Sequence, residues 1–450
     1  YCFMLKNNCG FIAGFIVFIA LCHNAIASNA HPSVNQSEQD RAREAALTPQ
    51  QQEYQSTRVY SADEKITFPK ERNCKYIKEV NIESEDRTLT QKLLGKLIIQ
   101  AKSQCLGIDG IRLLTRSLQN ELIVKGYITS LIDIPSQSLE NGILHLTLTY
   151  GKIGHIAFAT DEPVTRTSLW NALPFSAGDI LRLPDLEQGM ANLQRIPGSA
   201  AHMNLLPGQN YAETDVRLTR QLDKSWQVGA WLDDAGSRAT GRYQGGGALY
   251  LYDMASLNDI LYVAGGGDVE FNQHDDGNKN GNIYYSVPFG YWNMSLYAAR
   301  SQYLQQFRGQ WSTTDYESKN RYYSATLSRL LSHTRTQKTT LDAKIFKSTS
   351  RYYFGGSELS VMRKQNPGWD LTLRHQHYFD SKIIEASLGV QNRLPWLSST
   401  PTPEENAGLY DKHARVLHAD LQALMKFPLT GNKFSWAPQI SAQLSPDILS

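Results

Sequence analysis

Two histidines are the residues in this sequence whose spacing suggests metal chemistry. His375 and His377 stand two positions apart, so on a strand both imidazoles would share one face and could bind one ion. The pattern offers no third ligand, and histidines on a surface or inside a lumen are the favoured interpretation. We therefore expect no metal site.

Two glycine clusters could suggest a phosphate-binding loop. Gly245 to Gly247 and Gly265 to Gly267 lie in strand-rich sequence, however, and lack the helix that must follow such a loop. Strand bulges or loop joints explain them better. The eleven histidines form no elbow or triad motif with serine and aspartate. We predict no catalytic residue, no cofactor and no enzymatic activity.

The N-terminus has the pattern of an export signal. Lys6 precedes a short apolar run at 10–22, and Ala25 and Ala27 form an A-x-A cleavage site before Ser28. The run is too short to span a bilayer. We predict a signal peptide at 1–27, and an uncleaved anchor is the alternative.

The cysteines then point to a disulfide. Three of the five would leave with the signal peptide, and Cys74 and Cys105 would remain in an oxidising compartment. A bridge between them would stabilise the fold by about 3–4 kcal/mol on the chain-entropy model. Two free buried thiols are the alternative.

Composition excludes two classes of protein. Hydrophobic residues make up 41% of the 450, too few for a bundle of membrane helices. The net charge of +2 gives no electrostatic reason to expect nucleic-acid binding. The 23 tyrosines are typical of a protein that has many exposed strands and girdles of aromatic side chains. An extracellular β-sandwich would have a similar composition.

Residues 28–67 are polar, and a helix at 36–54 would have few apolar residues; by itself this pattern indicates a linker.

Residues 68–150 and 151–221 then repeat one β-α-α-β-β unit. In the first unit we expect strands at 76–83, 127–134 and 143–150, a helix capped by Thr88, and a second helix at 109–125 ended by Gly126. In the second unit we expect strands at 152–159, 200–206 and 214–221 and helices at 165–173 and 184–196, the latter entered through Pro184.

Beyond residue 221, long alternating strands replace the helices. Apolar side chains alternate with polar ones from Leu417 to Phe427 and from Phe434 to Leu444. Such lengths match strands that cross a bilayer at a tilt, and in lipid only a closed barrel pairs every backbone amide. Residues 222–450 therefore predict a transmembrane β-barrel. We count roughly eleven strands, whereas single-chain bacterial barrels have even numbers, so we expect the last strands to be missing from this sequence.

The whole mature sequence resembles two-partner-secretion outer-membrane transporters, the exporters of haemolysins, filamentous haemagglutinins and contact-dependent-inhibition toxins. Segments of both repeats are similar to the family's two POTRA (polypeptide-transport-associated) domains, and the early strands are similar to those of its barrel. The motifs are Cys105-Leu106-Gly107, Gly126-Tyr127-Ile128-Thr129, Asp185-Leu186-Glu187-Gln188-Gly189, Leu193-Gln194-Arg195-Ile196-Pro197 and Tyr285-Ser286-Val287-Pro288-Phe289-Gly290-Tyr291-Trp292.

The resemblance implies a barrel of sixteen strands, of which about eleven are present here, preceded by two α/β POTRA domains in the periplasm. The family's Arg-Gly-Phe/Tyr loop motif does not occur in this sequence. The implied location is the outer membrane of a Gram-negative bacterium, in contact with its lipid. The same resemblance implies that the polar helix at 36–54 plugs the pore.

The implied function is export, without ATP, of an unfolded secreted partner, a large β-helical protein, by a monomeric transporter (type V, two-partner secretion). The alternative is a barrel-assembly insertase of the wider superfamily, although insertases usually carry more POTRA repeats. An extended partner segment can add to an open sheet edge. The edges that the family topology indicates are residues 129–134 and 201–206, namely Thr129, Ser130, Leu131, Ile132, Asp133, Ile134, Ala201, His202, Met203, Asn204, Leu205 and Leu206.

Overall fold

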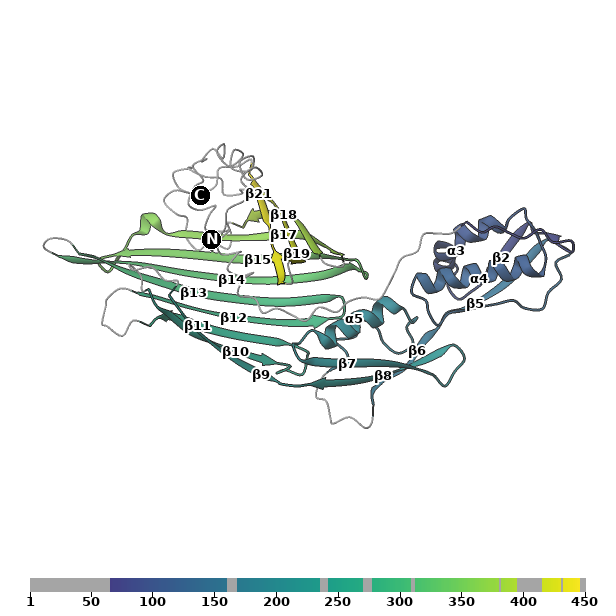
Figure 1. The fold of residues 1–450 in the computed structure, drawn as a ribbon, viewed down its shortest axis with the longest axis horizontal. Helices are drawn as coiled ribbons and strands as arrows, with labels where there is room; N and C mark the ends of the chain where they lie inside the picture. The colour runs from purple at the N-terminus through teal and green to yellow at the C-terminus, as the bar shows by residue number, and fades with distance from the viewer. Residues whose placement is uncertain are drawn as a thin grey trace.

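The computed structural model describes residues 65–159, 168–234, 242–269, 277–308, 312–379, 382–394, 415–429 and 432–445. Two small α/β units precede one large antiparallel sheet, and the second unit lies between the first unit and the sheet (Figure 1). The expected signal peptide with Ala25, Ala27 and Ser28, and the expected plug helix at 36–54, lie outside these residues and stay predictions. Within the described ranges, no helix is long and apolar enough to cross a membrane.

The first unit packs two helices against a three-stranded sheet of order β2-β5-β4. Leu114, Leu118 and Leu122 of the second helix, α4, are fully buried, as their spacing predicted. Gly126 follows that helix with φ +92°, a left-handed conformation that suits glycine. The elements are β1 (Lys75–Tyr76), β2 (Glu79–Glu83), α3 (Arg87–Ala101), β3 (Cys105–Leu106), α4 (Ile108–Val124), β4 (Leu131–Asp133) and β5 (Ile143–Thr149).

Three details of this unit differ from the sequence prediction. The strand expected at 76–83 is divided, since Tyr76 lies in β1, which pairs with β3, and residues 79–83 form β2, which pairs with β5. Asp86, not Thr88, caps α3: its extended backbone directs the carboxylate to the amide of Leu89, at 2.9 Å, whereas Thr88 already lies inside the first turn. The strand expected at 127–134 is reduced to β4, because residues 127–130 form a turn that contacts the second unit.

The segment before the first unit is fixed to it at two points. Cys74 and Cys105 form a disulfide beside the start of α4. The carboxylate of Glu71 accepts hydrogen bonds from the amides of Gly107, Asp109 and Gly110. Glu71 therefore caps α4 from a distance, because the helix begins after Gly107, which has no side chain to do so.

The second unit has the sheet order β6-β8-β7, which is the order of the first unit's sheet. Its helix starts with Pro184 in the first turn, as expected. The helix expected at 165–173 is wrong for residues 168–173, which form a turn closed by the Leu173 amide and the Leu169 carbonyl; residues 165–167 lie outside the described ranges. The elements are β6 (Lys152–Phe158), α5 (Leu183–Gln194), β7 (Ser199–Pro207) and β8 (Glu213–Leu222).

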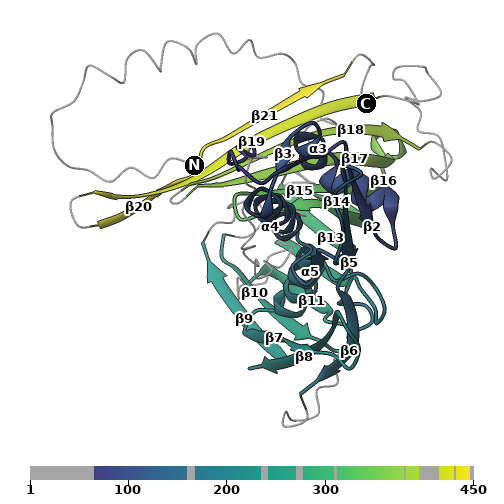
Figure 2. The same ribbon diagram turned by 90° about the vertical axis from the view of Figure 1, so that its right-hand side faces the viewer.

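The large sheet is an antiparallel meander in which each strand pairs with its neighbours in the chain (Figure 2). Its path runs from β9 to β20, with β16 beside β15 and with β21 beside β19. The run expected from Phe434 to Leu444 is divided at Ala437 and Pro438 into β20 and β21, which both pair with β19. The strands are β9 (Trp226–Asp233), β10 (Gln244–Tyr252), β11 (Ile260–Asp268), β12 (Gly277–Phe289), β13 (Trp292–Arg308), β14 (Thr313–His333), β15 (Gln337–Phe354), β16 (Ser357–Glu358), β17 (Lys364–Phe379), β18 (Lys382–Arg393), β19 (Arg415–Leu429), β20 (Asn432–Trp436) and β21 (Gln439–Leu444), with a short helix η2 (Ser360–Met362).

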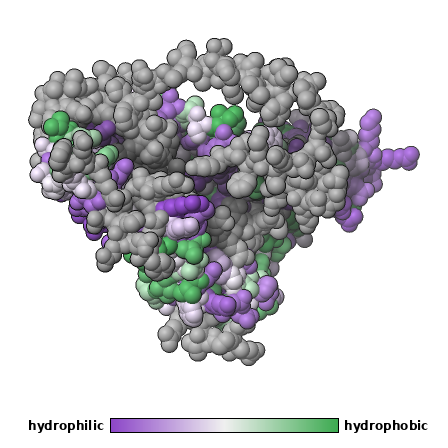
Figure 3. Space-filling view, turned by 60° about the vertical axis from the view of Figure 1, so that its left-hand side comes forward, coloured by the Kyte–Doolittle hydropathy of each residue, from purple (hydrophilic) through white to green (hydrophobic). Residues whose placement is uncertain are grey.

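The two faces of this sheet reverse the usual order of a soluble protein. Apolar side chains such as Ile283, Leu388 and Leu417 are exposed, while their polar neighbours, among them Ser286 and His418, are buried. Figure 3 shows hydrophobic surface gathered in patches in the lower half of the view, beside hydrophilic patches. An apolar outer face and a polar inner face are what strands in contact with lipid require.

Candidate functional site

The two predicted binding edges are edge strands in the structure, but not over their whole length. β4 and β7 each lie at the edge of a three-stranded sheet. β7 contains all of residues 201–206, whereas β4 contains only Leu131, Ile132 and Asp133. Thr129, Ser130 and Ile134 lie outside β4, and the prediction that they form part of the edge strand is wrong.

Thr129 and Ser130 instead join the two units. Ser130 is fully buried and its hydroxyl accepts from the amide of Gly151 at 3.1 Å. A Cβ on Gly151 would overlap Thr129, so the glycine permits this close approach. The Gly126 carbonyl accepts from the Leu183 amide at 2.8 Å. The turn after α4 therefore fixes one unit against the other.

The backbone of β7 presents hydrogen-bonding groups to the outside. The Leu218 carbonyl of β8 accepts a hydrogen bond from the Ala159 amide, which follows β6. The backbone groups of the even-numbered residues of β8 therefore point to β6, and those of the odd-numbered residues point to β7. These residues lie opposite even-numbered ones of β7, such as Asn204 opposite Arg217. Opposite residues alternate between bonded and non-bonded pairs, so the amides and carbonyls of Met203 and Leu205 point away from the sheet.

A polar stripe on α5 attaches the second unit to the large sheet. The side chains of Gln188 and Asn192 both donate to the carbonyl of Gly290, in the turn between β12 and β13, at 3.0 and 2.8 Å. Tyr291, the next residue in that turn, donates its hydroxyl to Asp185 at 2.5 Å. Gly290 has φ +57° and packs against Pro174, so the turn fits closely against the second unit.

Arg195 extends this stripe into the sheet. Its guanidinium is 5% exposed and donates to the Asn258 carbonyl at 3.0 Å, the Ser286 hydroxyl at 2.5 Å and Asn293 Oδ1 at 3.1 Å. Burial lowers the pKa of Arg195 to about 10, with nearby Tyr284 and Asp259 acting in the opposite direction. The side chain remains charged at neutral pH. A second buried pair, Arg220 with Asp253 at 2.8 Å, lies at the same junction.

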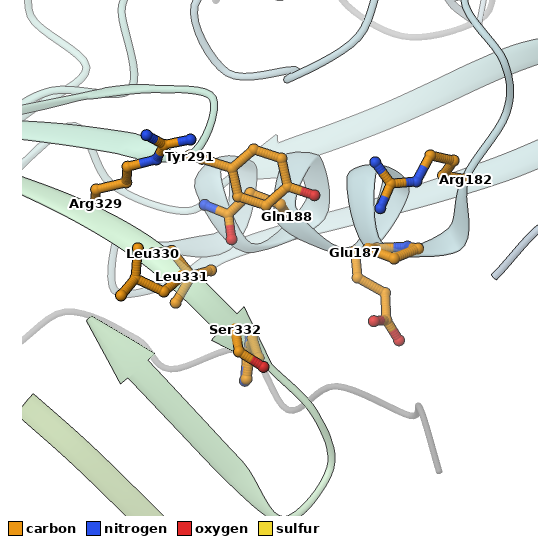
Figure 4. A pocket seen from close by; sticks show the side chains of 10 residues that line it. Arg182, Glu187, Gln188, Tyr291, Arg329, Leu330, Leu331 and Ser332 are labelled. Atoms are coloured by element: carbon orange, nitrogen blue, oxygen red, sulfur yellow. The ribbon is translucent and has the colours of Figure 1, made fainter. Parts of the chain in front are cut away.

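A cavity of about 270 Å³ opens beside this junction. Tyr291 stands in it between Arg329 of β14 and Arg182, which precedes α5 (Figure 4). Four of its lining residues come from the second unit and six from the large sheet: Arg182, Pro184, Glu187 and Gln188, and then Tyr291, Arg329, Leu330, Leu331, Ser332 and His333.

The histidines singled out in the sequence do not form a cluster of ligands. His375 Nδ1 lies 2.8 Å from the hydroxyl of Thr339, and the rings of His375 and His377 are 6.4 Å apart. Among the described residues, no group of three or more His, Cys, Asp or Glu side chains could hold a metal ion. His418, which the sequence did not single out, lies on the inner face 2.6 Å from Asp370.

The comparison with protein families gives three adjoining matches. Residues 76–151 match the ShlB-type POTRA domain and residues 152–207 match a second POTRA domain. Residues 212–450, more than half of the chain, match the haemolysin secretion/activation protein family ShlB/FhaC/HecB. The chain belongs to this family. The predicted order of two POTRA domains followed by a large antiparallel sheet is therefore confirmed.

Relatives of this family member carry transporter names. It is 29% identical to the outer membrane transporter CdiB-2 of Burkholderia pseudomallei (strain 1026b) over 77% of this chain and 59% of the relative. It is 25% identical to the hemolysin transporter protein ShlB of Serratia marcescens over 67% of this chain and 53% of the relative. The chain thus spans less than two thirds of the length of these relatives.

Solved structures of the family share the fold. CdiB from Acinetobacter baumannii matches with a TM-score of 0.76 at 24% identity, covering 92% of this chain and 76% of that chain. CdiB from Escherichia coli matches with a TM-score of 0.73 at 22% identity, covering 93% and 76%. At these identities the likeness shows the fold alone.

The polar stripe of α5 was not predicted from the sequence, although Asp185, Gln188 and Arg195 belong to the quoted family motifs. Asp185, Gln188, Asn192 and Arg195 follow one another at intervals of three or four positions, so they share one face of a helix. That spacing was a usable signal, since a row of polar residues on an otherwise core-facing helix indicates a polar partner. The identity of the partner could not be read from it.

Proposed function

We propose that this protein is an outer-membrane transporter that captures an unfolded secreted partner in the periplasm and exports it through its barrel. The open edge of β7 carries the proposal. β8 pairs with β7 and leads into β9 through residues 223–225 alone, so a segment bound along β7 is separated by β7 from the strand that continues into the large sheet. The Ser225 carbonyl also accepts from Tyr252 of β10, which holds this connection against the sheet.

Strand addition suits an unfolded cargo. Main-chain hydrogen bonds bind an extended segment whatever its sequence, and side-chain pockets add selectivity. The exposed side chains of Leu205 and Leu206 offer apolar contacts at this edge. On POTRA 1, the corresponding proposed edge is Leu131 to Asp133 of β4.

The inner face of the sheet provides a path for a hydrated chain. Buried polar side chains such as Ser286, Ser324, Ser348 and Thr372 line it, next to a cluster of aromatic side chains that includes Tyr284, Tyr322 and Phe346. A polypeptide can pass such a surface without losing hydrogen bonds to its backbone, which would be costly in an apolar channel. Export then needs no ATP and no bond-breaking chemistry, because folding of the partner outside the cell draws it outward.

The partner we propose is a large β-helical protein of the haemolysin or inhibition-toxin type, carried by a monomeric transporter in the lipid of the outer membrane. The family to which the chain belongs favours this function over a barrel-assembly insertase. No charge pattern in the sequence suggests nucleic acid as a ligand.

Export into liposomes tests the proposal. The complete protein, reconstituted into liposomes, should move the secreted partner encoded by the neighbouring gene across the membrane without an energy source. Transported partner should be protected from protease added on the side where it started. Empty liposomes are the control. Insertion of unrelated barrels, or passage of small solutes without the partner, would contradict the exporter.

A further inference from the structure

POTRA 1 and POTRA 2 differ in how their edge strands are closed, and the difference lies in glutamine side chains. In POTRA 1, Gln119 of α4 donates its amide to the Ser130 carbonyl at 2.7 Å and accepts from the Ile132 amide at 3.1 Å. One side chain thus makes the donor–acceptor pair of contacts that an incoming strand would make. Gln119 thus occupies the outward amide of β4, at Ile132, and the carbonyl of Ser130 just before the strand.

A second glutamine closes the same edge farther along. β4 covers β5 only from Thr147 to Thr149. Beyond that point Gln137 donates to the His145 carbonyl at 2.6 Å and accepts from the His145 amide at 2.7 Å. Gln137 therefore stands where β4 would have continued. Of the outward backbone groups between Ser130 and Ile132, the Ile132 carbonyl remains for a partner.

The edge of POTRA 2 is mostly open. Gln194 of α5 donates to the Ala201 carbonyl at 2.7 Å, which is the counterpart of the Gln119 contact. Beyond Ala201, no hydrogen bond among the described residues occupies the outward amides and carbonyls of Met203 and Leu205. β7 has nine residues, against three in β4, so it offers a longer template for pairing.

The side chains along β7 also fit one kind of occupant. Ala201 and Met203 pack into the POTRA 2 core on the side covered by α5, and Leu205 continues this row with 37% of its surface exposed. A strand added here would place alternate side chains beside that row. An extended segment with apolar residues at every second position matches it.

We propose that Gln119 and Gln137 close the POTRA 1 edge, so that strand addition by an extended amphipathic segment of the exported partner is directed to Met203 and Leu205 of POTRA 2. This inference rests on the proposed function and narrows it. Unpaired edges invite unwanted pairing, and a side chain that occupies them is a means of preventing it. The two glutamines thus decide which of two similar domains receives the cargo.

The test uses the full chain in detergent and a synthetic peptide of alternating valine and threonine with lysine at each end, carrying one benzophenone. Cross-linked positions are mapped by mass spectrometry, and affinity is measured by fluorescence anisotropy. In the wild type the peptide should label residues around 203–207 and not those around 130–134. Labelling at 130–134, or at neither edge, would overturn the proposal.

Two sets of variants sharpen the result. Leu205→Pro removes the outward amide at a position where an edge strand tolerates proline, and should weaken binding about tenfold, whereas Leu205→Val keeps the amide and should bind as the wild type does. The double variant Gln119→Ala/Gln137→Ala should add a second labelled region at 130–134, and the exposed Gln91→Ala on α3 should not. Unchanged affinity in Leu205→Pro, or an unchanged labelling pattern in the double variant, would contradict the inference.

Export of the partner is measured separately in the liposome assay. Export together with labelling of POTRA 1 would contradict this inference and leave the transporter function intact. Labelling of β7 without any export would contradict the function and leave β7 as the open edge.

Discussion

The guanidinium of Arg195, at the end of α5, donates to the hydroxyl of Ser286 on β12 at 2.5 Å, although 91 positions separate the two residues. Both side chains are buried, and the same guanidinium reaches the turn between β10 and β11 through Asn258. One helix end thus ties POTRA 2 to the turn between β10 and β11 and to the strands β12 and β13. Together with the contacts of Gln188 and Asn192 to Gly290, it holds POTRA 2 against the sheet.

Arg195→Gln should loosen the junction. The shorter neutral side chain removes the guanidinium that donates to the Asn258 carbonyl and the Ser286 hydroxyl, and loss of a buried charged hydrogen bond costs about 2 kcal/mol. We expect a lower denaturation midpoint and faster proteolytic cleavage between POTRA 2 and the sheet. Arg112→Gln, at an exposed arginine of α4, is the matched control and should change neither. Equal behaviour of the two variants would argue against the junction.

Gly126→Ala should disturb the contact between the POTRA domains. Gly126 has φ +92°, and an added Cβ would lie 2.7 Å from Cδ of Pro184, so strain and a clash act together. We expect a loss of about 1–3 kcal/mol in the free energy of unfolding. Gly178→Ala separates the two causes, because Gly178 has φ +91° with nothing within 4 Å of the added atom. Thermal unfolding of both variants should show the larger loss at Gly126; equal losses would exclude a steric role for Pro184.

The cap that Glu71 forms on α4 should weaken in acid. Desolvation raises the pKa of Glu71, but the amides of Gly110, Asp109 and Gly107 together outweigh it and hold the pKa below its usual value. A carboxylate with a lowered folded-state pKa stabilises the fold above its unfolded-state pKa, and that stability is lost as the pH falls through the folded value. As the pH falls from neutral to below the usual pKa of a glutamate, α4 should therefore lose protection in the wild type.

Hydrogen exchange of peptides from α4, corrected for the intrinsic effect of pH, measures this loss. Glu71→Gln should be less protected at neutral pH and nearly insensitive to acid in this range. Glu83→Gln, at an exposed glutamate of β2, should retain the wild-type pH dependence. If hydrogen exchange of α4 in Glu71→Gln depended on pH as it does in the wild type, Glu71 would not be the residue that caps α4.

Gly246→Val should destabilise the first strands of the large sheet. The indole of Trp231 on β9 lies across Gly246, and an added Cβ would overlap Cζ2 of the ring and would also lie 2.6 Å from the backbone oxygen of Gly265. Forcing bulk into such a contact costs about 1–3 kcal/mol. Gly247→Val is the control, because the nearest atom to its added Cβ is the Gly229 carbonyl oxygen at 3.6 Å. Denaturation in detergent should separate the variants, and identical midpoints would show that Trp231 moves aside freely.

Local patterns in the sequence predicted most of the elements correctly. The exposed Leu417 beside the buried His418 follows from alternation alone, because successive side chains of a strand point to opposite faces whatever the rest of the chain does. The buried row on α4 follows in the same way from helical periodicity. The repeated unit and the early strands were similar to those of a known family, and so the fold class was accessible from the sequence.

The sequence by itself therefore determined the kinds of elements, their order and the faces that they bury, because the geometry of a short stretch of backbone sets these properties. Only the tertiary structure decided that Thr129 and Ser130 join two domains, that Gln119 occupies the edge of β4, and that Arg195 reaches Ser286. Each of these contacts depends on where separately folded elements meet. An extended pattern at 127–134 is equally compatible with a free edge and with a buried turn, and the docking of POTRA 2 selects the turn.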